Sequence, residues 1–571
     1  MSFLSLSLQR TSFHRLQLHI KQITARPFHS TLRNYLAHKG EAMATTHHDE
    51  SHDYFHYTSG RWLWGEEEQL RERYRAFNVN ELQKVAVGIA GSEKCVSMSK
   101  IGEGNFNKVF RLQMDNGSVL MARIPHPNAG PPKYTTTSEV ATMDFAKSIL
   151  DIPVPKILAY CATADNPVGS EYIIMEEAQG IQLSKVWDTM DLKEQLGIVT
   201  ELVTIDEKLL SASLNRHGAL YYRKDSFPGC TTAKVTGNIT DSLKADVANR
   251  FVIGPTVERA FWKKQRAVMA VDRGPWTSAC EYVEAIAHRE IAWLSHYAES
   301  LPLSMEKWSA SKGQSDRQAH IDLLGKFLSV IAQLLPKEPE LLAPFLWHRD
   351  LHPGNLFVYD GKISSVIDWQ SCWVGPLILR ARAPRLLDYN GEIMLKLPPE
   401  YEEMPEDERR SVEYKVQQSV QVYSYEHKTA GRNPLLNQVL RYPHGKMLSN
   451  VVEFASASWD GDILPLRDCL IRIERDWKEY AGSTATCPYH FSAEEIQKSH
   501  EDAVSYNDMR DFWDDLEGRV DDTGFTTPDF FDDAVDLFST LRENGLKTLE
   551  GPELKRFEEQ TRWVLDYRKK Q

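Results

Sequence analysis

The sequence of 571 residues is poor in cysteine, and none of its seven cysteines belongs to a C-x-x-C pair. Sparse, unpaired cysteines argue against a disulfide framework and a zinc ribbon and favour a reducing compartment. The sequence also lacks an uninterrupted apolar run of the roughly 18 residues that a membrane helix needs. Its best run, 323–335, is interrupted by Lys326 and Gln333 and predicts a buried or amphipathic helix, so no membrane span is expected.

Basic residues are also too few for a nucleic-acid-binding protein. The net charge is −13 at pH 7, whereas binding to phosphate backbones relies on clustered lysine and arginine. No nucleic-acid partner is therefore expected. A hydrophobic content of 42% is ample for a buried core, and the length suits a large two-lobed enzyme with insertions.

Residues 1–40 contain no aspartate or glutamate. If they form a helix, apolar residues such as Phe13 and Leu16 lie on one side and basic residues such as Arg15 and Lys21 on the other. An acid-free amphipathic start of this kind is typical of a mitochondrial presequence, and it predicts import, most simply into the matrix. The alternative is a basic, disordered tail. Residues 41–94 are predicted to form a linker and an N-terminal helical extension.

A glycine-rich hairpin follows the extension. Residues 95–124 predict a three-stranded meander, with Gly102 and Gly104 in its first turn and Asp115-Asn116-Gly117 in its second. Glycines at such a turn let backbone N–H groups approach phosphate oxygens. The alternative for this turn is an ordinary tight hairpin.

The next elements complete a small lobe over residues 95–178. Thr135-Thr136-Thr137-Ser138 are expected to cap a helix that runs on to about residue 146, and two further strands are expected at 157–160 and 172–176. The predicted order is three strands, one helix and two strands. Residues 179–571 are expected to form a larger, mainly helical lobe. The predicted fold class is therefore α+β, with an antiparallel sheet in the small lobe.

The most specific motif is His348-Arg349-Asp350-Leu351-His352-Pro353-Gly354-Asn355, with Asp368 thirteen residues later. Phosphoryl transfer needs a carboxylate to orient or deprotonate the acceptor hydroxyl, together with oxygen ligands for Mg²⁺. Asp350 and Asn355 on one loop, and Asp368 after the next strand, supply these groups. The segment 348–369 is therefore the predicted catalytic region.

These motifs resemble the aminoglycoside phosphotransferase and choline kinase superfamily, which has a two-lobed, protein-kinase-like fold. Asp368-Trp369 stands where protein kinases have D-F-G, and no A-P-E-like activation segment follows, which disfavours a protein kinase. Stretches such as 57–63, 122–125 and 138–142 also resemble a group of fungal mitochondrial proteins called altered inheritance of mitochondria protein 9. The resemblance extends from about residue 54 towards the C-terminus and is looser beyond about residue 400.

The resemblance implies ATP and Mg²⁺ as cofactors, and it implies a role for each matching residue. Asp350 would be the catalytic base, and Asn355 and Asp368 would bind magnesium. The remaining implied positions contact the nucleotide: Gly102 and Gly104 in the phosphate loop, the Glu176 carbonyl and Ala178 amide at adenine, Arg123 at the phosphates, and Glu139 as its partner.

Arg123 is a departure, because related kinases place lysine at this position. Arginine keeps the charge and can pair with Glu139 in a bidentate manner, but it is bulkier and planar. Lys108 is a poor substitute, since strand alternation directs it to the opposite face. The leading hypothesis is an ATP- and Mg²⁺-dependent transferase acting on a hydroxyl of an unidentified small molecule. The alternative is an ATP-binding pseudokinase or scaffold.

The large lobe adds an insertion around residues 222–290 that would cap the acceptor site. Aromatic residues in and beside it would form either a substrate wall or, more commonly, core. The acidic stretch 508–536 would either attract a cationic acceptor or form a solvated helical face. The sequence does not define the acceptor or the oligomeric state.

Overall fold

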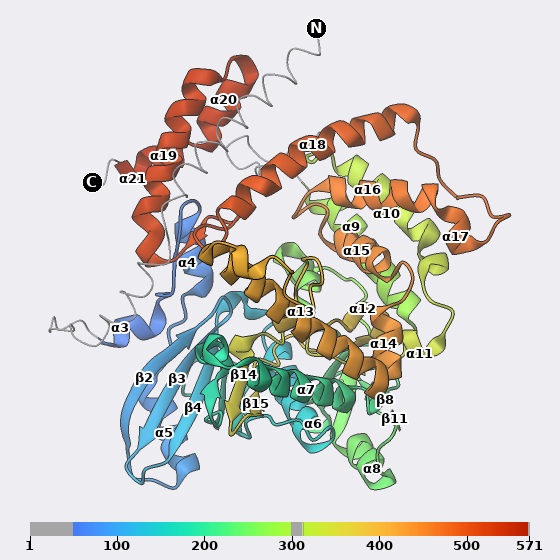
Figure 1. Cartoon of the computed structure of the whole chain (residues 1–571). Coiled ribbons are helices and arrows are strands. Elements are labelled where there is room, and N and C mark those ends of the chain that lie inside the picture. Colours follow the sequence, from blue (N-terminus) through green and yellow to red (C-terminus); the bar gives the residue numbers. More distant parts are fainter. Residues whose placement is uncertain (1–49, 299–310, 312, 569–571) are drawn as a thin grey trace.

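The computed structural model describes residues 50–568 except 299–310 and 312. The predicted presequence, residues 1–40, lies outside these residues. Figure 1 shows a small lobe built on a curved sheet and a larger, mainly helical lobe beside it. The predicted α+β, two-lobed fold is confirmed.

The small lobe is a five-stranded antiparallel sheet in the order β2-β3-β4-β6-β5. Its strands are β2 (Cys95–Glu103), β3 (Asn107–Met114), β4 (Val119–Pro125), β5 (Ile157–Cys161) and β6 (Tyr172–Glu176). Helix α6 (Tyr134–Ser148) lies between β4 and β5 in the sequence. The predicted order of three strands, one helix and two strands is confirmed.

One face of this sheet is covered by α5 (Val79–Ala90). Every second residue of β3 is buried, as strand geometry requires when one face packs on a core. Phe110 and Leu112 of this face join Leu82 and Ala86 of α5 in one cluster. The Asn78 side chain caps the first turn of α5 by accepting a hydrogen bond from the Glu81 N–H.

The predicted capping role of residues 135–138 is wrong. Helix α6 begins one residue earlier, at Tyr134, after the N-cap residue Lys133, which provides no side-chain cap. The threonine hydroxyls donate elsewhere: Thr135 to the Pro131 carbonyl at 3.0 Å and Thr136 to the Glu171 carboxylate at 2.6 Å. Bonding of this kind satisfies hydroxyls inside a helix without marking its first residue.

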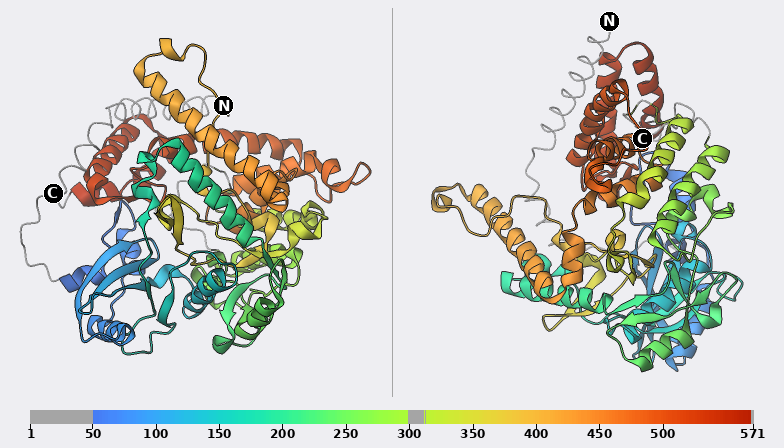
Figure 2. Two further views of the ribbon diagram at one scale, coloured as in Figure 1. Left: turned by 60° about the horizontal axis from the view of Figure 1, so that its bottom comes forward. Right: turned by 90° about the vertical axis from the view of Figure 1, so that its right-hand side faces the viewer.

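Apart from α5 and α6, the helices of the described residues pack mainly in the large lobe. They are α3 (Glu50–Phe55), α4 (Glu66–Arg73), α7 (Leu192–Leu209), α8 (Asp241–Arg250), α9 (Ala279–Tyr297), α10 (Arg317–Leu334), α11 (Pro339–Leu342), α12 (Leu377–Arg380), α13 (Glu406–Arg432), α14 (Pro434–Leu440), α15 (Gly445–Ala457), α16 (Ile463–Arg475), α17 (Trp477–Ala481), α18 (Ala493–Asp515), α19 (Phe531–Thr548), α20 (Gly551–Gln560) and α21 (Trp563–Arg568), with short 3-10 turns between them. Figure 2 shows α13 lying along α7 at the outside of this lobe. Among the described residues, no helix has both the length and the apolar composition that a bilayer crossing demands.

Short sheets link these helices. They contain β7 (Ile181–Gln182), β8 (Ala212–Leu214), β9 (Ala219–Tyr222), β10 (Thr231–Thr232), β11 (Val235–Gly237), β12 (Phe251–Gly254), β13 (Pro344–Leu346), β14 (Leu356–Tyr359), β15 (Lys362–Val366) and β16 (Val374–Pro376). The hairpin β14–β15 supports the predicted catalytic region. Its turn, Asp360-Gly361, has φ of 51° and 70°, and aspartate and glycine tolerate such positive values.

The N-terminal extension pairs with the C-terminal helices. Strand β1 (Arg61–Trp62) is antiparallel to β17 (Phe525–Thr526). Leu63 joins Phe512, Leu516 and Phe538 in a separate hydrophobic cluster. The extension therefore lies between the small lobe and the C-terminal helices, with α4 at this junction in Figure 1.

Candidate active site

The loop before β14 holds Asp350 and Asn355 together. The Asn355 side-chain amide donates to the Asp350 carbonyl at 3.0 Å, and the Ile367 N–H donates to the Asn355 carbonyl at 3.0 Å. These bonds tie the loop to the residue before Asp368. With its nitrogen engaged, Asn355 keeps its side-chain oxygen as the group that can face a cation.

His348 braces the same loop. Burial lowers the pKa of His348, so its imidazole is neutral at neutral pH. Its Nδ1 then accepts the Asp350 N–H at 3.3 Å, and its Nε2 donates to the Ile367 carbonyl at 3.0 Å. Trp369 packs edge-on against the imidazole, with 4.8 Å between ring centroids. These contacts hold the loop that carries Asp350 against the residues around Asp368.

Asp368 follows β15 with a φ of 61°, a left-handed conformation that is uncommon outside glycine. Such conformations often occur at functional sites. Its carboxylate is 44% exposed and lies 3.8 Å from Nη1 of Arg123. Asp368 therefore stands between the large lobe, which carries it, and the small lobe, which supplies the guanidinium.

Arg123 and Glu139 form a buried pair. Both terminal nitrogens of Arg123 donate to the two Glu139 carboxylate oxygens, and the Arg123 side chain is only 8% exposed. Burial lowers the pKa of Arg123 to about 10, partly offset by the Asp368 carboxylate, so it stays positive at neutral pH. Its buried Nε has no hydrogen-bond partner among the described residues. That orphaned donor, beside Asp368, fits an anionic ligand such as a phosphate.

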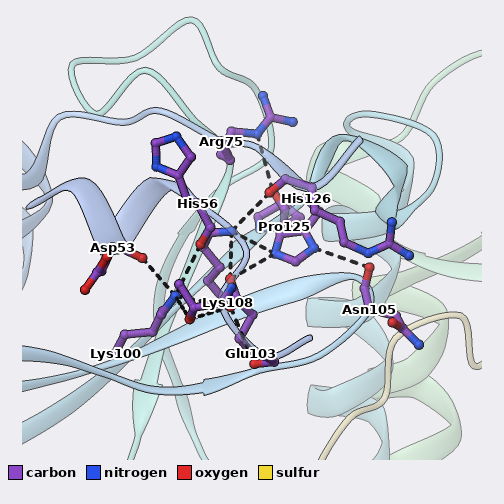
Figure 3. Close-up of polar contacts among 12 residues, drawn as sticks. Asp53, His56, Arg75, Lys100, Glu103, Asn105, Lys108, Pro125 and His126 are labelled. Carbon is purple, nitrogen blue, oxygen red and sulfur yellow. Dashed lines mark hydrogen bonds and ion pairs between the residues drawn. The ribbon is translucent and has the colours of Figure 1, made fainter. Parts of the chain in front are cut away.

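The two loop glycines flank a buried carboxylate. Gly102 lies within β2, opposite Val109, and the Gly104 N–H donates to the Asn107 carbonyl at 3.0 Å. Between them, Glu103 is buried and pairs with Lys108 Nζ at 2.8 Å (Figure 3). Lys108 also donates to the Arg73 carbonyl at 3.0 Å. Lys108 therefore lies on the buried face of β3 with Phe110 and Leu112, opposite the face of Val109.

Residues of the N-terminal extension contact the second carboxylate oxygen of Glu103. The Thr58 N–H donates to Glu103 Oε2 at 2.7 Å, and Lys100 Nζ lies 3.1 Å from the same oxygen. Lys100 also donates to the backbone carbonyls of Asp53 and His56, as the dashed lines in Figure 3 trace. The phosphate loop is therefore anchored to the N-terminal extension as well as to its own sheet.

Glu176 and Ala178 lie at the edge where β6 leads into the large lobe. The Glu176 N–H donates to the Lys156 carbonyl at 3.0 Å, and its carboxylate accepts from the Lys156 N–H at 3.3 Å. Ala178 is half-buried. Within the described part of the chain, its N–H has no hydrogen-bond acceptor, which leaves it open to an adenine ring.

A second arginine lies on Asp350 itself. Arg385 Nη1 is 2.9 Å from Asp350 Oδ1, and His352 Nε2 lies 3.7 Å from Oδ2. The Asp350 carboxylate is therefore flanked by basic groups on both oxygens.

The side-chain oxygens of Asn355 and Asp368 suit a magnesium ion that is shared with phosphates, and they do not form a metal site made only of protein ligands. The described residues contain no group of three or more His, Cys, Asp or Glu side chains arranged to hold a metal ion. Mg²⁺ at phosphoryl-transfer sites takes only one or two protein carboxylates and completes its octahedron with phosphates and water. The oxygens of Asn355 and Asp368 suit that role.

The insertion reaches the phosphate loop. The Arg259 guanidinium lies 3.5 Å from the centre of the ring of Phe106, which is two residues after Gly104. Most aromatic residues considered for a substrate wall are buried core instead: Tyr221, Phe251, Phe261 and Trp276. The acidic stretch 508–536 spans parts of α18 and α19, whose apolar side chains form a cluster with Leu63 that contains no catalytic-loop residue.

The structure brings Asp350, Asn355, Asp368, Arg123 and Glu139 into one connected region. The bonds described above join Gly102 and Gly104 to the adjoining sheet. Sequence reasoning missed Glu103, although its place between two glycines was a usable signal. It also missed Arg385, for which no motif exists.

Comparisons with known proteins agree with this geometry. A model of the family described as phosphotransferase enzyme family matches residues 97–379. A subtelomeric hrmA-associated cluster protein of Aspergillus fumigatus is 30% identical over 486 residues, covering 78% of this chain and 92% of that protein. Altered inheritance of mitochondria protein 9 of Yarrowia lipolytica is 27% identical over 487 residues, covering 80% and 82%.

Solved structures show more distant similarity. A ternary complex of aminoglycoside phosphotransferase APH(4)-Ia with ADP and hygromycin B is 14% identical and covers 71% of this chain and 100% of that one, with a TM-score of 0.34. A fructosamine-3-kinase-like structure from Thermobifida fusca is 12% identical and covers 75% and 100%, also with a TM-score of 0.34.

Proposed function

This chain belongs to the phosphotransferase enzyme family, and from that premise we propose that it transfers the γ-phosphoryl group of ATP to a hydroxyl of a small molecule, with Mg²⁺ as cofactor. The observation that carries the proposal is the meeting of Asp368 with Arg123 across the two lobes, beside the loop that joins Asp350 to Asn355.

Each residue has a distinct part in this proposal. Asp350 orients the acceptor hydroxyl and takes its proton as the new oxygen–phosphorus bond forms and the bond to the departing ADP oxygen breaks. Arg123 holds phosphate oxygens, and Glu139 fixes the direction of its guanidinium. Bound magnesium would supply neutralisation of phosphate charge, and Asn355 and Asp368 would hold it. Gly102 and Gly104 keep the loop free of side chains, and Glu176 and Ala178 would bind adenine through their backbone.

A screen of acceptors with ADP release as the readout tests this function. Wild-type protein should release ADP in the presence of at least one hydroxyl compound, while Asp350→Ala should not. Asp350→Ala should nevertheless bind nucleotide normally, because it does not contact the phosphate-holding residues. Release that is the same in both proteins, across sugars, polyols, amino alcohols and hydroxy acids, would refute transfer.

A second candidate is a nucleotide-binding protein without transfer activity. The specific observation in its favour is that Arg123 commits one N–H of each terminal nitrogen to Glu139, which leaves fewer donors for phosphates. This candidate predicts nucleotide binding by calorimetry together with no acceptor-dependent release of ADP.

We also propose that the protein is mitochondrial and is imported into the matrix. The support is the acid-free start of the sequence and the name of its relatives, altered inheritance of mitochondria protein 9, mitochondrial. The mature chain should begin between about residues 29 and 40. Native protein that still begins at Met1 or Ser2 would exclude a cleaved presequence.

A further inference from the structure

One oxygen of the Asp350 carboxylate is occupied by a guanidinium. Arg385 and Asp350 approach to 2.9 Å, yet their side chains are 64% and 47% exposed. An exposed pair of this kind is weak and is readily exchanged for another partner. The pair marks the place where an incoming acceptor must compete for both members.

Arg385 is presented by a well-anchored segment. Pro384 before it is buried, and the Leu387 N–H donates to the Pro384 carbonyl at 2.8 Å. Leu387 packs in a cluster with residues of α7 and α13: Val199, Val203 and Tyr425. The Arg385 guanidinium is therefore exposed to solvent, while its backbone is held in place. A side chain held in this way can bind a ligand group at a defined position.

Other basic groups lie close to Asp350 or to its sequence neighbour Arg349. His352 lies 3.7 Å from the second oxygen of Asp350. Arg349 is half-buried, and its buried Nε has no hydrogen-bond partner within the described ranges. Burial, followed by the nearby charge of Arg349, lowers the pKa of Arg380 to about 10, so Arg380 stays cationic at neutral pH. Among the described residues, Asp350 is the only carboxylate in ion-pair contact with Arg385.

We infer, on the basis of the proposed phosphotransfer, that the acceptor carries an anionic group, either a carboxylate or a phosphate ester, close to the hydroxyl that is phosphorylated. Arg385 binds that group. A guanidinium is a planar fork that accepts either anion through two parallel hydrogen bonds. As Arg385 turns to the acceptor, it releases Asp350 to the hydroxyl. A cationic acceptor would instead meet the positive charge of Arg385.

Matched acceptors that differ in charge test this inference. The three-carbon set is glycerol, glycerol 3-phosphate, glycerate and serinol; the hexose set is glucose, glucose 6-phosphate, gluconate and glucosamine. The full chain should use an anionic member of a set about tenfold or more better, in kcat/KM, than the neutral and amine members. Preference for the phosphate or for the carboxylate member identifies which anion is recognised. Better use of the neutral or amine members would overturn the inference.

Substitutions locate the preference. Arg385→Gln should raise KM for the anionic acceptor about ten- to a hundredfold, the range expected for a lost charge-assisted contact, while KM for ATP stays unchanged. Arg385→Lys should restore part of the loss. Arg382→Gln is the matched control, because Arg382 lies on the same segment but approaches Glu453, at 4.0 Å. If Arg385→Gln instead raised activity toward every acceptor equally, Arg385 would only block Asp350 and would not bind the acceptor.

A binding measurement separates this inference from phosphotransfer itself. With Mg²⁺ and the non-hydrolysable nucleotide AMP-PNP present, glycerol 3-phosphate or glycerate should raise the melting temperature of wild type and Arg382→Gln but not of Arg385→Gln. If no acceptor gives ADP release, phosphotransfer fails, and this difference in melting alone decides whether Arg385 binds anions. Equal melting shifts in all three proteins would refute the inference.

Discussion

Glu103 and Lys108 form an ion pair of 2.8 Å in which neither side chain exceeds 2% exposure. Burial by itself would raise the pKa of Glu103, but the hydrogen bonds from Lys108 and Thr58 outweigh it and the pKa is lowered. Burial lowers the pKa of Lys108, and the hydrogen bond and charge of Glu103 oppose that effect. The pair joins the phosphate loop to residues 53–73, which lie before the part of the chain matched by the family model.

Replacing Glu103 by Gln should therefore loosen the loop. The change leaves the Lys108 ammonium buried without its counter-ion, and breaking a buried pair in this way costs about 3–5 kcal/mol. We expect a lower melting temperature and a KM for ATP that rises about tenfold or more, with a smaller change in kcat. Glu81→Gln, which removes an exposed pair with Lys84, is the control and should change neither quantity. An unaltered KM for ATP would mean that the anchor does not support nucleotide binding.

Asp368→Ala should abolish the magnesium-dependent part of nucleotide stabilisation. A ligand that binds only the folded protein adds stability by mass action, so ATP with Mg²⁺ should raise the melting temperature of wild type more than ATP with EDTA. The variant should retain only the EDTA-level shift. Asp388→Asn, an exposed acid on the neighbouring loop, should behave as wild type. Identical magnesium effects in wild type and Asp368→Ala would exclude Asp368 as a metal ligand.

Arg123 separates the two candidate functions. Arg123→Ala should lower nucleotide affinity about ten- to a hundredfold, because it removes a charge-assisted contact and leaves Glu139 buried without a partner. Arg123→Lys should reduce turnover in an active enzyme, since an ammonium cannot hold Glu139 and phosphates in the same planar geometry. A rise in ADP release with Arg123→Lys would favour the non-catalytic candidate. Calorimetry and ADP release on the same preparations provide both readouts.

Asp206 gives a pH-dependent prediction. Burial raises its pKa to about 7 from the ordinary 3.8, and Tyr425 donates to its Oδ2 at 2.7 Å. The unfolded chain loses this proton at lower pH than the folded chain does. Stability should therefore fall as pH rises from about 4 to about 7, by at most ~4 kcal/mol.

Asp206→Asn should remove this pH-dependent loss of stability. The free energy of unfolding of the variant should therefore increase relative to that of wild type as pH rises. Urea unfolding at pH 5, 6 and 8 measures the free energy of unfolding of both proteins. Glu201→Gln, on the same helix, is the control and should keep the wild-type slope. Parallel profiles for wild type and Asp206→Asn would show that Asp206 is ionised in the folded protein.

The small-lobe strands were predictable because local signals agree there. Strand alternation, the Asn116-Gly117 turn and the apolar run 172–175 all indicate the same elements. The start of α6 was misplaced because a threonine can either cap a helix or lie within its first turns. Only the tertiary contact of Thr136 with Glu171 shows that these threonines lie inside the helix.

The catalytic loop was predictable for a different reason. Asp350, Asn355 and Asp368 lie close in sequence, so their spacing along the chain already limits how far apart they can lie in the fold. Arg385 comes from a segment with no periodic pattern, and only the packing of Leu387 on α7 and α13 brings it to Asp350. Contacts of this kind have no local signature.

The pairing of β1 with β17 has a consequence for how the protein assembles. Tyr567 donates to the Trp62 carbonyl at 3.2 Å across 505 positions of sequence, so this junction can close only after nearly the whole chain is available. Contacts of such long range form late, because ordering the intervening chain is costly. A chain that ends before residue 525 lacks the strand that flanks the phosphate-loop anchor. Loss of that strand would therefore withdraw support from the segment that contacts Glu103.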